Sequence, residues 1–211
     1  MEGTKILLSA EELQLVQNTQ WLLTKNNIIE KAKMLFGELA ANLQQLTEKN
    51  RHRLPDAVPL FSPKVFKGEY YQGLPYVMLD YPRIFTKDEV FAVRTMFWWG
   101  NFFSVTLQLK GSYQQLFSNA LISNKKVLSD HGFCVSVSDD EWRHDFELDN
   151  YQSLTSDAPS DLTSDAPSDV LPQALRRNFF KLAVRIPLSS WNNAVPAIAK
   201  YHEIIMSVLT N

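Results

Sequence analysis

The stretch Val90–Lys110, VFAVRTMFWWGNFFSVTLQLK, decides the fold class of this chain. Two runs of alternating side chains, 90–99 and 102–110, flank Gly100-Asn101. Glycine at the first central position is typical of a two-residue type II′ hairpin turn. We therefore expect two long antiparallel strands here, in the register that pairs Trp98 with Phe103 and Arg94 with Leu107.

The segments on both sides of this hairpin extend the sheet. Residues 65–71 and 74–81 alternate around Gln72-Gly73 and are rich in Tyr and Val, which suit a pleated surface. Residues 133–138 and 179–186 also alternate and predict two further strands. Because neighbouring hairpins favour antiparallel pairing, the fold class we expect is α+β, with a largely antiparallel sheet of about five to six strands.

Helices are predicted before and after the strands. Ser9 and Glu12 form a capping-box pattern that opens a first helix through about Leu23, and Asn26 or Asn27 is expected to cap a second. That second helix carries an apolar stripe along one face until prolines break it from Pro55 onward. A helix over 112–129 and a closing helix that ends near 209 complete the set. An N-terminal helical pair and a C-terminal helix should therefore pack on the sheet.

The chain of 211 residues fits one domain. Within it we distinguish the helical pair (1–54), the sheet with a helix (60–150), a flexible loop (151–172) and a closing strand and helix (173–211). The loop contains LTSDAPSD twice in tandem, at 154–161 and 162–169, and this composition cannot form a core. We interpret it as a duplicated surface insertion, with a docking or phosphorylation role as the alternative.

Composition narrows the function classes. The net charge of −2 argues against binding to a phosphate backbone. The single cysteine, Cys134, cannot form an internal disulfide or a thiolate metal cluster. With no apolar signal core at the start and no long apolar run, a cytoplasmic location is expected and a membrane span is not. The P-loop, GxGxxG, HExxH, GxSxG and CxxC motifs are all absent, so the sequence identifies neither a reaction nor a cofactor.

The aromatic end of the hairpin is the first candidate site. Tryptophan and arginine are typical of binding hot spots, and an arginine on a core-facing strand needs an anion, either Asp80 or the acid group of a ligand. Tyrosines of the preceding strands could line a pocket for a small anionic ligand. The candidate ligand-binding residues are Arg94, Trp98, Trp99, Phe102, Tyr76 and Arg83. Alternatively, all these aromatics belong to the core and Arg94 is paired internally.

A second candidate site lies in the acidic segment after residue 138. On a strand, Asp140 and His144 would share one face and could supply a metal ligand pair or an acid–base pair. Two positions four residues apart on a strand are too distant to share a metal without help, so a solvated strand end is the simpler interpretation.

Three functions follow from these candidates. A non-catalytic module that binds a small ligand or a protein at the aromatic hairpin is the one we favour. The alternatives are an enzyme that uses Asp140 and His144, and a weak nucleic-acid binder that uses the arginines Arg51, Arg53, Arg176 and Arg177. The chain is expected to be a monomer, or a homodimer formed through its helical pair.

Overall fold

The structure is a computed structural model that describes residues 6–154 and 169–210. Its centre is a seven-stranded antiparallel sheet in the order β1-β2-β3-β4-β7-β5-β6. The strands are β1 Lys64–Tyr71, β2 Leu74–Phe85, β3 Val90–Trp98, β4 Phe102–Lys110, β5 Cys134–Ser136, β6 Tyr151–Ser153 and β7 Phe180–Pro187. The helices are α1 Ala10–Gln17, α2 Thr19–Lys49, α3 Ser112–Ser123, α4 Lys125–Asp130, α5 Val170–Ala174 and α6 Ala194–Thr210. The predicted α+β class with an antiparallel sheet is confirmed, with more strands than expected.

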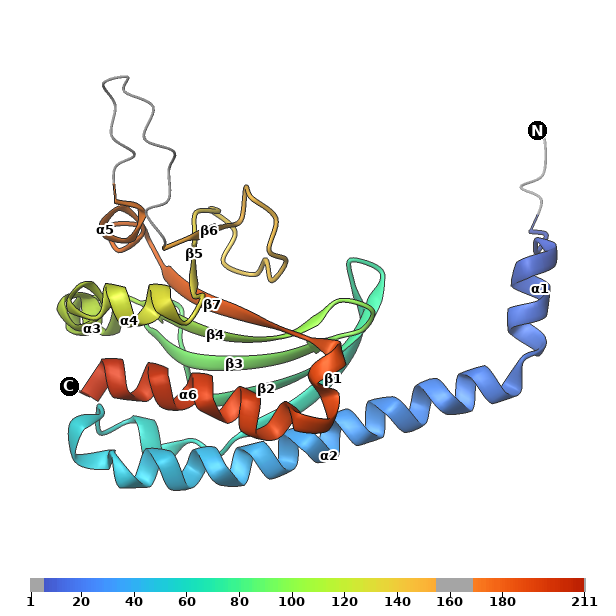
Figure 1. Cartoon of the computed structure of the whole chain (residues 1–211), viewed down its shortest axis with the longest axis horizontal. Coiled ribbons are helices and arrows are strands. Elements are labelled where there is room, and N and C mark those ends of the chain that lie inside the picture. Colours follow the sequence, from blue (N-terminus) through green and yellow to red (C-terminus); the bar gives the residue numbers. More distant parts are fainter. Residues whose placement is uncertain (1–5, 155–168, 211) are drawn as a thin grey trace, which may run out of the picture.

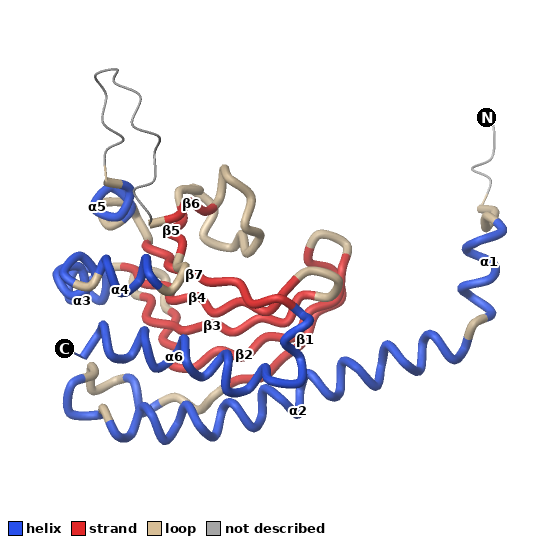
Figure 2. The backbone as a smooth tube through the Cα atoms, in the orientation of Figure 1, coloured by secondary structure: helices blue, strands red, loops and turns tan. Residues whose placement is uncertain are grey.

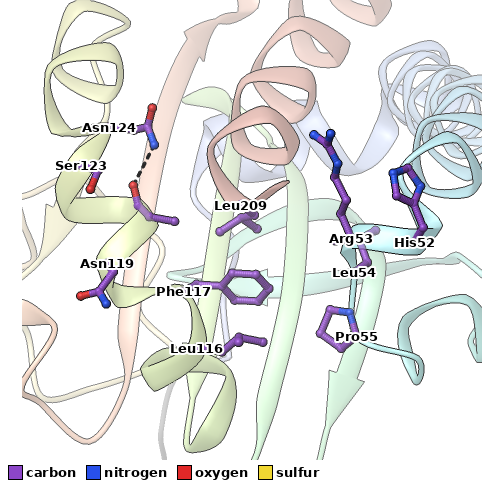
Figure 3. A pocket seen from close by; sticks show the side chains of 11 residues that line it. His52, Arg53, Leu54, Pro55, Leu116, Phe117, Asn119, Ser123, Asn124 and Leu209 are labelled. Carbon is purple, nitrogen blue, oxygen red and sulfur yellow. Dashed lines mark hydrogen bonds between the residues drawn. The ribbon is translucent and has the colours of Figure 1, made fainter. Parts of the chain in front are cut away.

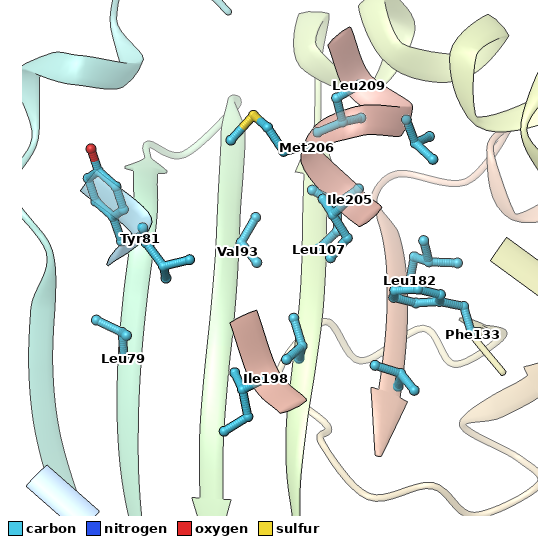
Figure 4. Close-up of a cluster of buried hydrophobic side chains, with 14 of the residues drawn as sticks. Leu79, Tyr81, Val93, Leu107, Phe133, Leu182, Ile198, Ile205, Met206 and Leu209 are labelled. Atoms are coloured by element: carbon cyan, nitrogen blue, oxygen red, sulfur yellow. The ribbon is translucent and has the colours of Figure 1, made fainter. Parts of the chain in front are cut away.

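One face of the sheet is covered by α2 and α6, which Figure 1 and Figure 2 show side by side beneath the strands. Apolar side chains that alternate along β3 and β4 point toward these helices and are buried. Figure 4 shows Val93 and Leu107 facing Ile198 and Ile205 of α6. Burial of such side chains supplies most of the free energy of folding, so this layer is the main core.

The register of the central hairpin differs from the prediction by one residue. Trp98 pairs with Phe102 and Arg94 pairs with Thr106, because Trp99 belongs to the loop. The amide of Asn101 donates to the carbonyl of Trp98, and Gly100 has a φ of 73° as the third residue of that turn. This geometry resembles a type II turn, in which glycine takes the positive φ at the third position, and not the type II′ turn that the sequence predicts.

That shift changes which residues share a face, because side chains alternate along a strand. Arg94, Met96 and Trp98 lie on the same side as the polar residues of β4, opposite the helices. The apolar residues of β4, which the sequence register placed beside Arg94, lie in the helix-covered core. Arg94 therefore lies on the second face of the sheet, beside Ser104, Thr106 and Gln108 of β4.

The N-terminal helices also divide at a different residue. α1 begins after Ser9, where the predicted capping box with Glu12 is formed. It ends at Gln17, and Asn18 caps α2 by accepting a hydrogen bond from the amide of Trp21. The predicted start at Asn26 or Asn27 is wrong, because Asn18 supplies the cap eight residues earlier. As a result α2 is a continuous helix of 31 residues.

The sequence analysis missed two short elements, β6 and α5, which flank the repeat-containing loop. Most of that loop, residues 155–168, lies outside the described residues, so both interpretations of the repeat stay predictions. The four segments proposed for the chain likewise stay predictions. Among the described residues no helix is both long enough and apolar enough to span a bilayer.

Candidate functional site

On the second face of the sheet, a loop rather than a helix crosses the centre in the part of the chain that the structure describes. This loop, Val137–Asn150, connects β5 to β6 and lies on the opposite side of the sheet from α2 and α6 (Figure 1). The hydroxyl of Tyr71 accepts hydrogen bonds from the amides of His144, at 2.6 Å, and Asp145, at 3.3 Å. Phe146 packs edge-on against Phe102. The loop is thus attached to β1 and β4.

Between this loop and strands β1 to β3 lies a pocket of about 300 Å³, which we call the aromatic pocket. Its wall consists of aromatic rings and methionines, with one arginine and one histidine. The lining residues are Phe66, Tyr71, Tyr76, Met78, Arg94, Met96, Trp142 and His144. An apolar wall with a few convergent polar groups is the usual composition of a small-molecule site.

Arg94 and Asp80 form a buried ion pair beside this pocket. The Nε and Nη2 atoms of Arg94 donate to the two carboxylate oxygens of Asp80, at 2.7 and 2.9 Å. Their side chains are only 9% and 6% exposed. The guanidinium also lies 5.8 Å from the ring of Trp142. The anion that the sequence analysis required for Arg94 is therefore Asp80, and Nη1 is not used in this pair.

His144 is buried in the pocket wall. Burial lowers the pKa of its imidazole well below the usual value, and the positive charges of Lys181 and Arg94 lower it further. The ring is therefore neutral at physiological pH. It contacts the ring of Tyr71, with centroids 5.4 Å apart. A neutral imidazole carries one donor and one acceptor, so His144 can offer either to a ligand.

Lys181 on β7 anchors the 137–150 loop to the sheet. Its side chain is fully buried, and its amine donates to the backbone carbonyls of Glu141, at 3.1 Å, and of Arg143. Burial, with the nearby charge of Arg94, lowers the pKa of Lys181 to about 7. These bonds fix the backbone on both sides of Trp142, which is the pocket residue most exposed to solvent.

The predicted ligand-binding residues occupy three different places. Arg94 and Tyr76 line the aromatic pocket. Trp98 and Phe102 form a small apolar cluster beside it, together with Met78 and Met96. Trp99 packs against the helix-covered core near Phe97, and Arg83 donates to the carbonyl of Ser62 outside the pocket.

The two candidate metal ligands, Asp140 and His144, lie in different places. His144 lines the pocket, whereas the exposed Asp140 accepts a hydrogen bond from the amide of Trp142. Within the part of the chain that the structure describes, no group of three or more His, Cys, Asp or Glu side chains could hold a metal ion. A metal site at this pair stays a prediction.

Three of the four arginines of the nucleic-acid hypothesis have partners within the chain. Arg51 lies 3.5 Å from Glu48, Arg53 donates to the carbonyl of Thr210, and Arg177 pairs with Asp139. These contacts do not test nucleic-acid binding, which stays a prediction.

The sequence analysis missed several pocket residues. Phe66, Met78 and Met96 follow from strand alternation once the register is known, since they lie on the same face as Arg94. Trp142 could not be placed, because a tertiary contact rather than a local pattern positions its loop. Tyr71, by contrast, is one of the strand tyrosines that the sequence analysis expected to line a pocket.

No known family model matches this chain, and no curated protein or solved structure resembles it closely enough to count as a match. The argument for function therefore depends on the pocket itself.

Proposed function

We propose that this chain is a non-catalytic binding module that holds a small ligand in the aromatic pocket. The observation that carries the proposal is the aromatic pocket of about 300 Å³, which is lined by rings of β1, β2 and the 137–150 loop. Two buried polar side chains, Arg94 and His144, lie in its wall. Such a combination favours a ligand that is mainly apolar and has one polar end. The cytoplasmic location expected from the sequence belongs to the same proposal.

The polar end of the ligand should be a hydrogen-bond acceptor. Asp80 accepts hydrogen bonds from two of the five guanidinium N–H groups of Arg94, so the others, two of which are on Nη1, could donate to a ligand. None of the eight lining residues is a carboxylate, so an anionic group would meet no like charge in the wall. An aromatic carboxylic acid fits both conditions and agrees with the small anionic ligand expected from the sequence.

Saturation-transfer NMR with benzoate and benzamide tests this proposal. The two probes have the same ring and differ in charge, so the comparison separates stacking on the aromatic wall from recognition of the acid group. We expect both probes to bind weakly and benzoate to bind more tightly, because a charge-assisted hydrogen bond to Arg94 is stronger than a neutral one.

A pair of variants on the same loop assigns the signal to the pocket. Trp142→Ala removes a ring from the pocket wall and should reduce binding of both probes at least tenfold. Leu148→Ala changes an apolar side chain that is 85% exposed and does not line the pocket, so it should leave binding unchanged. Equal loss in both variants, or no signal with either probe, would contradict the proposed function.

A further inference from the structure

The N-terminal arm, residues 6–24, projects away from the sheet. Figure 1 shows α1 and the start of α2 extending beyond the strands, and none of these residues is buried. The arm nevertheless carries many large apolar side chains. Those that are roughly half or more exposed are Ile6, Leu7, Leu8, Leu13, Leu15, Val16, Trp21, Leu22 and Leu23. An exposed apolar surface of this extent is typical of an interaction site.

The arm continues a stripe that is buried elsewhere along α2. Leu43, Phe36 and Ile29 follow one another in steps of seven residues and face the core. One step further, Leu22 lies on the same helix face but is 49% exposed. Residues seven apart lie within about 20° of each other around a helix. The core-facing stripe of α2 therefore extends past the end of the sheet without a partner among the described residues.

A groove of about 820 Å³ lies at the other end of the molecule. Figure 3 shows Leu116, Phe117 and Leu209 on its floor and His52 and Arg53 along one edge. Leu116 is 62% exposed, so the floor offers apolar surface to a partner. None of the residues that line the groove is acidic.

The arm and the groove are complementary in charge and in chemistry. The only charged residues between positions 6 and 24 are Glu11 and Glu12, whereas the groove edge carries Arg53 and His52. Both surfaces are otherwise apolar or uncharged. On α1 itself, Leu13 and Val16 are 47% and 71% exposed and lie three residues apart on one face, so both can meet the apolar floor.

The arm cannot reach the groove of its own chain. α1 precedes the first residue of α2, and the groove residues His52 and Arg53 follow its last residue closely. A helix of 31 residues separates the two, which is about 46 Å at 1.5 Å per residue. Any contact between the arm and a groove must therefore join two molecules.

We propose that α1 of one copy of this chain docks in the groove of a second copy. The arm supplies Leu13 and Val16 to the apolar floor, and its acidic first turn meets Arg53 and His52. Because the two surfaces differ, the contact is heterologous, so the copies assemble head to tail. This inference concerns surfaces remote from the aromatic pocket and does not depend on the proposed function.

Sedimentation velocity with two variants tests the proposal. Leu13→Glu/Val16→Glu changes only exposed side chains of the arm, and Leu116→Glu changes an exposed side chain of the groove. We expect the mass of the wild-type chain to increase with concentration, and each variant to remain monomeric. Mixed together, the variants should form a 1:1 dimer, because one retains an intact arm and the other an intact groove.

Circular dichroism shows whether each variant keeps its helices, and Leu148→Glu, at an exposed position outside both surfaces, is the matched control that should assemble like the wild type. A wild-type chain that stays monomeric up to millimolar concentration would overturn the proposal. So would a groove variant that assembles normally while the arm variant does not, since that result indicates a symmetric contact between two arms.

Discussion

Arg94 on β3 stands directly opposite Asp80 on β2, and their side chains form a two-pronged ion pair on the sheet face away from the helices. Removal of one partner from a buried pair leaves an uncompensated charge. We therefore expect Arg94→Met to lower the free energy of unfolding by about 3–5 kcal/mol, as measured by urea denaturation.

The double variant Asp80→Leu/Arg94→Met should recover most of this loss, because replacement of both charges by apolar groups is often neutral. The same double variant should lose the preference for benzoate over benzamide. If the single variant Arg94→Met is as stable as the wild type, the pair is not the buried interaction described above.

His202 should make the protein less stable as the pH is lowered. Burial lowers its pKa to about 3, and its Nε2 atom lies 2.7 Å from the hydroxyl of Thr95. The unfolded chain takes up the proton near pH 6.5, whereas the folded chain does so near pH 3. Stability is therefore fully present above pH 6.5 and falls by about 1.4 kcal/mol per pH unit as the pH is lowered from 6.5 toward 3.

The variant His202→Gln tests this dependence. Glutamine keeps a hydrogen-bonding group near Thr95 but cannot titrate, so urea denaturation between pH 4 and 7 should show a slope that is smaller by about one proton. Leu148→Gln, at an exposed position, is the control and should reproduce the wild-type slope. An unchanged slope in His202→Gln would assign the acid sensitivity to other groups, such as His144.

Lys181 should control the order of the 137–150 loop. Lys181→Met has a similar shape but cannot donate to the carbonyls of Glu141 and Arg143. We expect the amides of residues 141–147 to exchange hydrogen at least tenfold faster, while the helices stay protected. Lys110→Met, which removes only a distant contact of 4.0 Å to Glu141, is the matched control and should exchange like the wild type.

The pH dependence of this variant follows from the lowered pKa of Lys181. Below pH 7 the folded chain must bury an ammonium ion, which lowers its free energy of unfolding. Between about pH 7 and 10.5 the folded chain has lost this proton while the unfolded chain still holds it, so the free energy of unfolding of the wild type rises with pH. The stability of Lys181→Met relative to the wild type should therefore increase as the pH is lowered from 10.5 to 7.

Gly68 leaves space for a wall of the aromatic pocket. It pairs with Tyr76 across β1 and β2, and an added Cβ would clash with the tyrosine ring. Since the end of the ring can swing, Gly68→Ala should move Tyr76 at little cost in stability and weaken benzoate binding severalfold. The control Gly37→Ala has open space on a helix, so it should stabilise the chain by about 0.5–1 kcal/mol without affecting binding.

Local patterns predicted the strands well, because alternation and turn residues are encoded within each segment. They did not predict the register of the central hairpin. Gly100-Asn101 fits a two-residue loop by composition, and only packing reveals that Trp99 leaves the strand to join the helix-covered core. The short elements β6 and α5 were missed because three to five residues are too few for a periodic signal.

Local patterns also did not predict how the aromatic pocket is assembled. Arg94 and Tyr76 were singled out from the sequence for one candidate site, and His144 for another. The structure brings them together because the Tyr71 hydroxyl and the Lys181 amine hold the backbone of the loop against the sheet. Both contacts join residues that are more than 35 positions apart in the chain, and no local pattern encodes them.

The uninterrupted length of α2 also fixes a direction. Each residue of an α-helix adds 1.5 Å of length and about 100° of rotation. The number of residues in α2 therefore sets both the distance of α1 from the sheet and the direction in which α1 points. An insertion of one or two residues near its start would turn α1 to the side or the back of the molecule. An insertion of seven residues, about two turns, would restore the direction of α1 and move it outward by about 10 Å. Related chains should therefore differ here by whole pairs of turns.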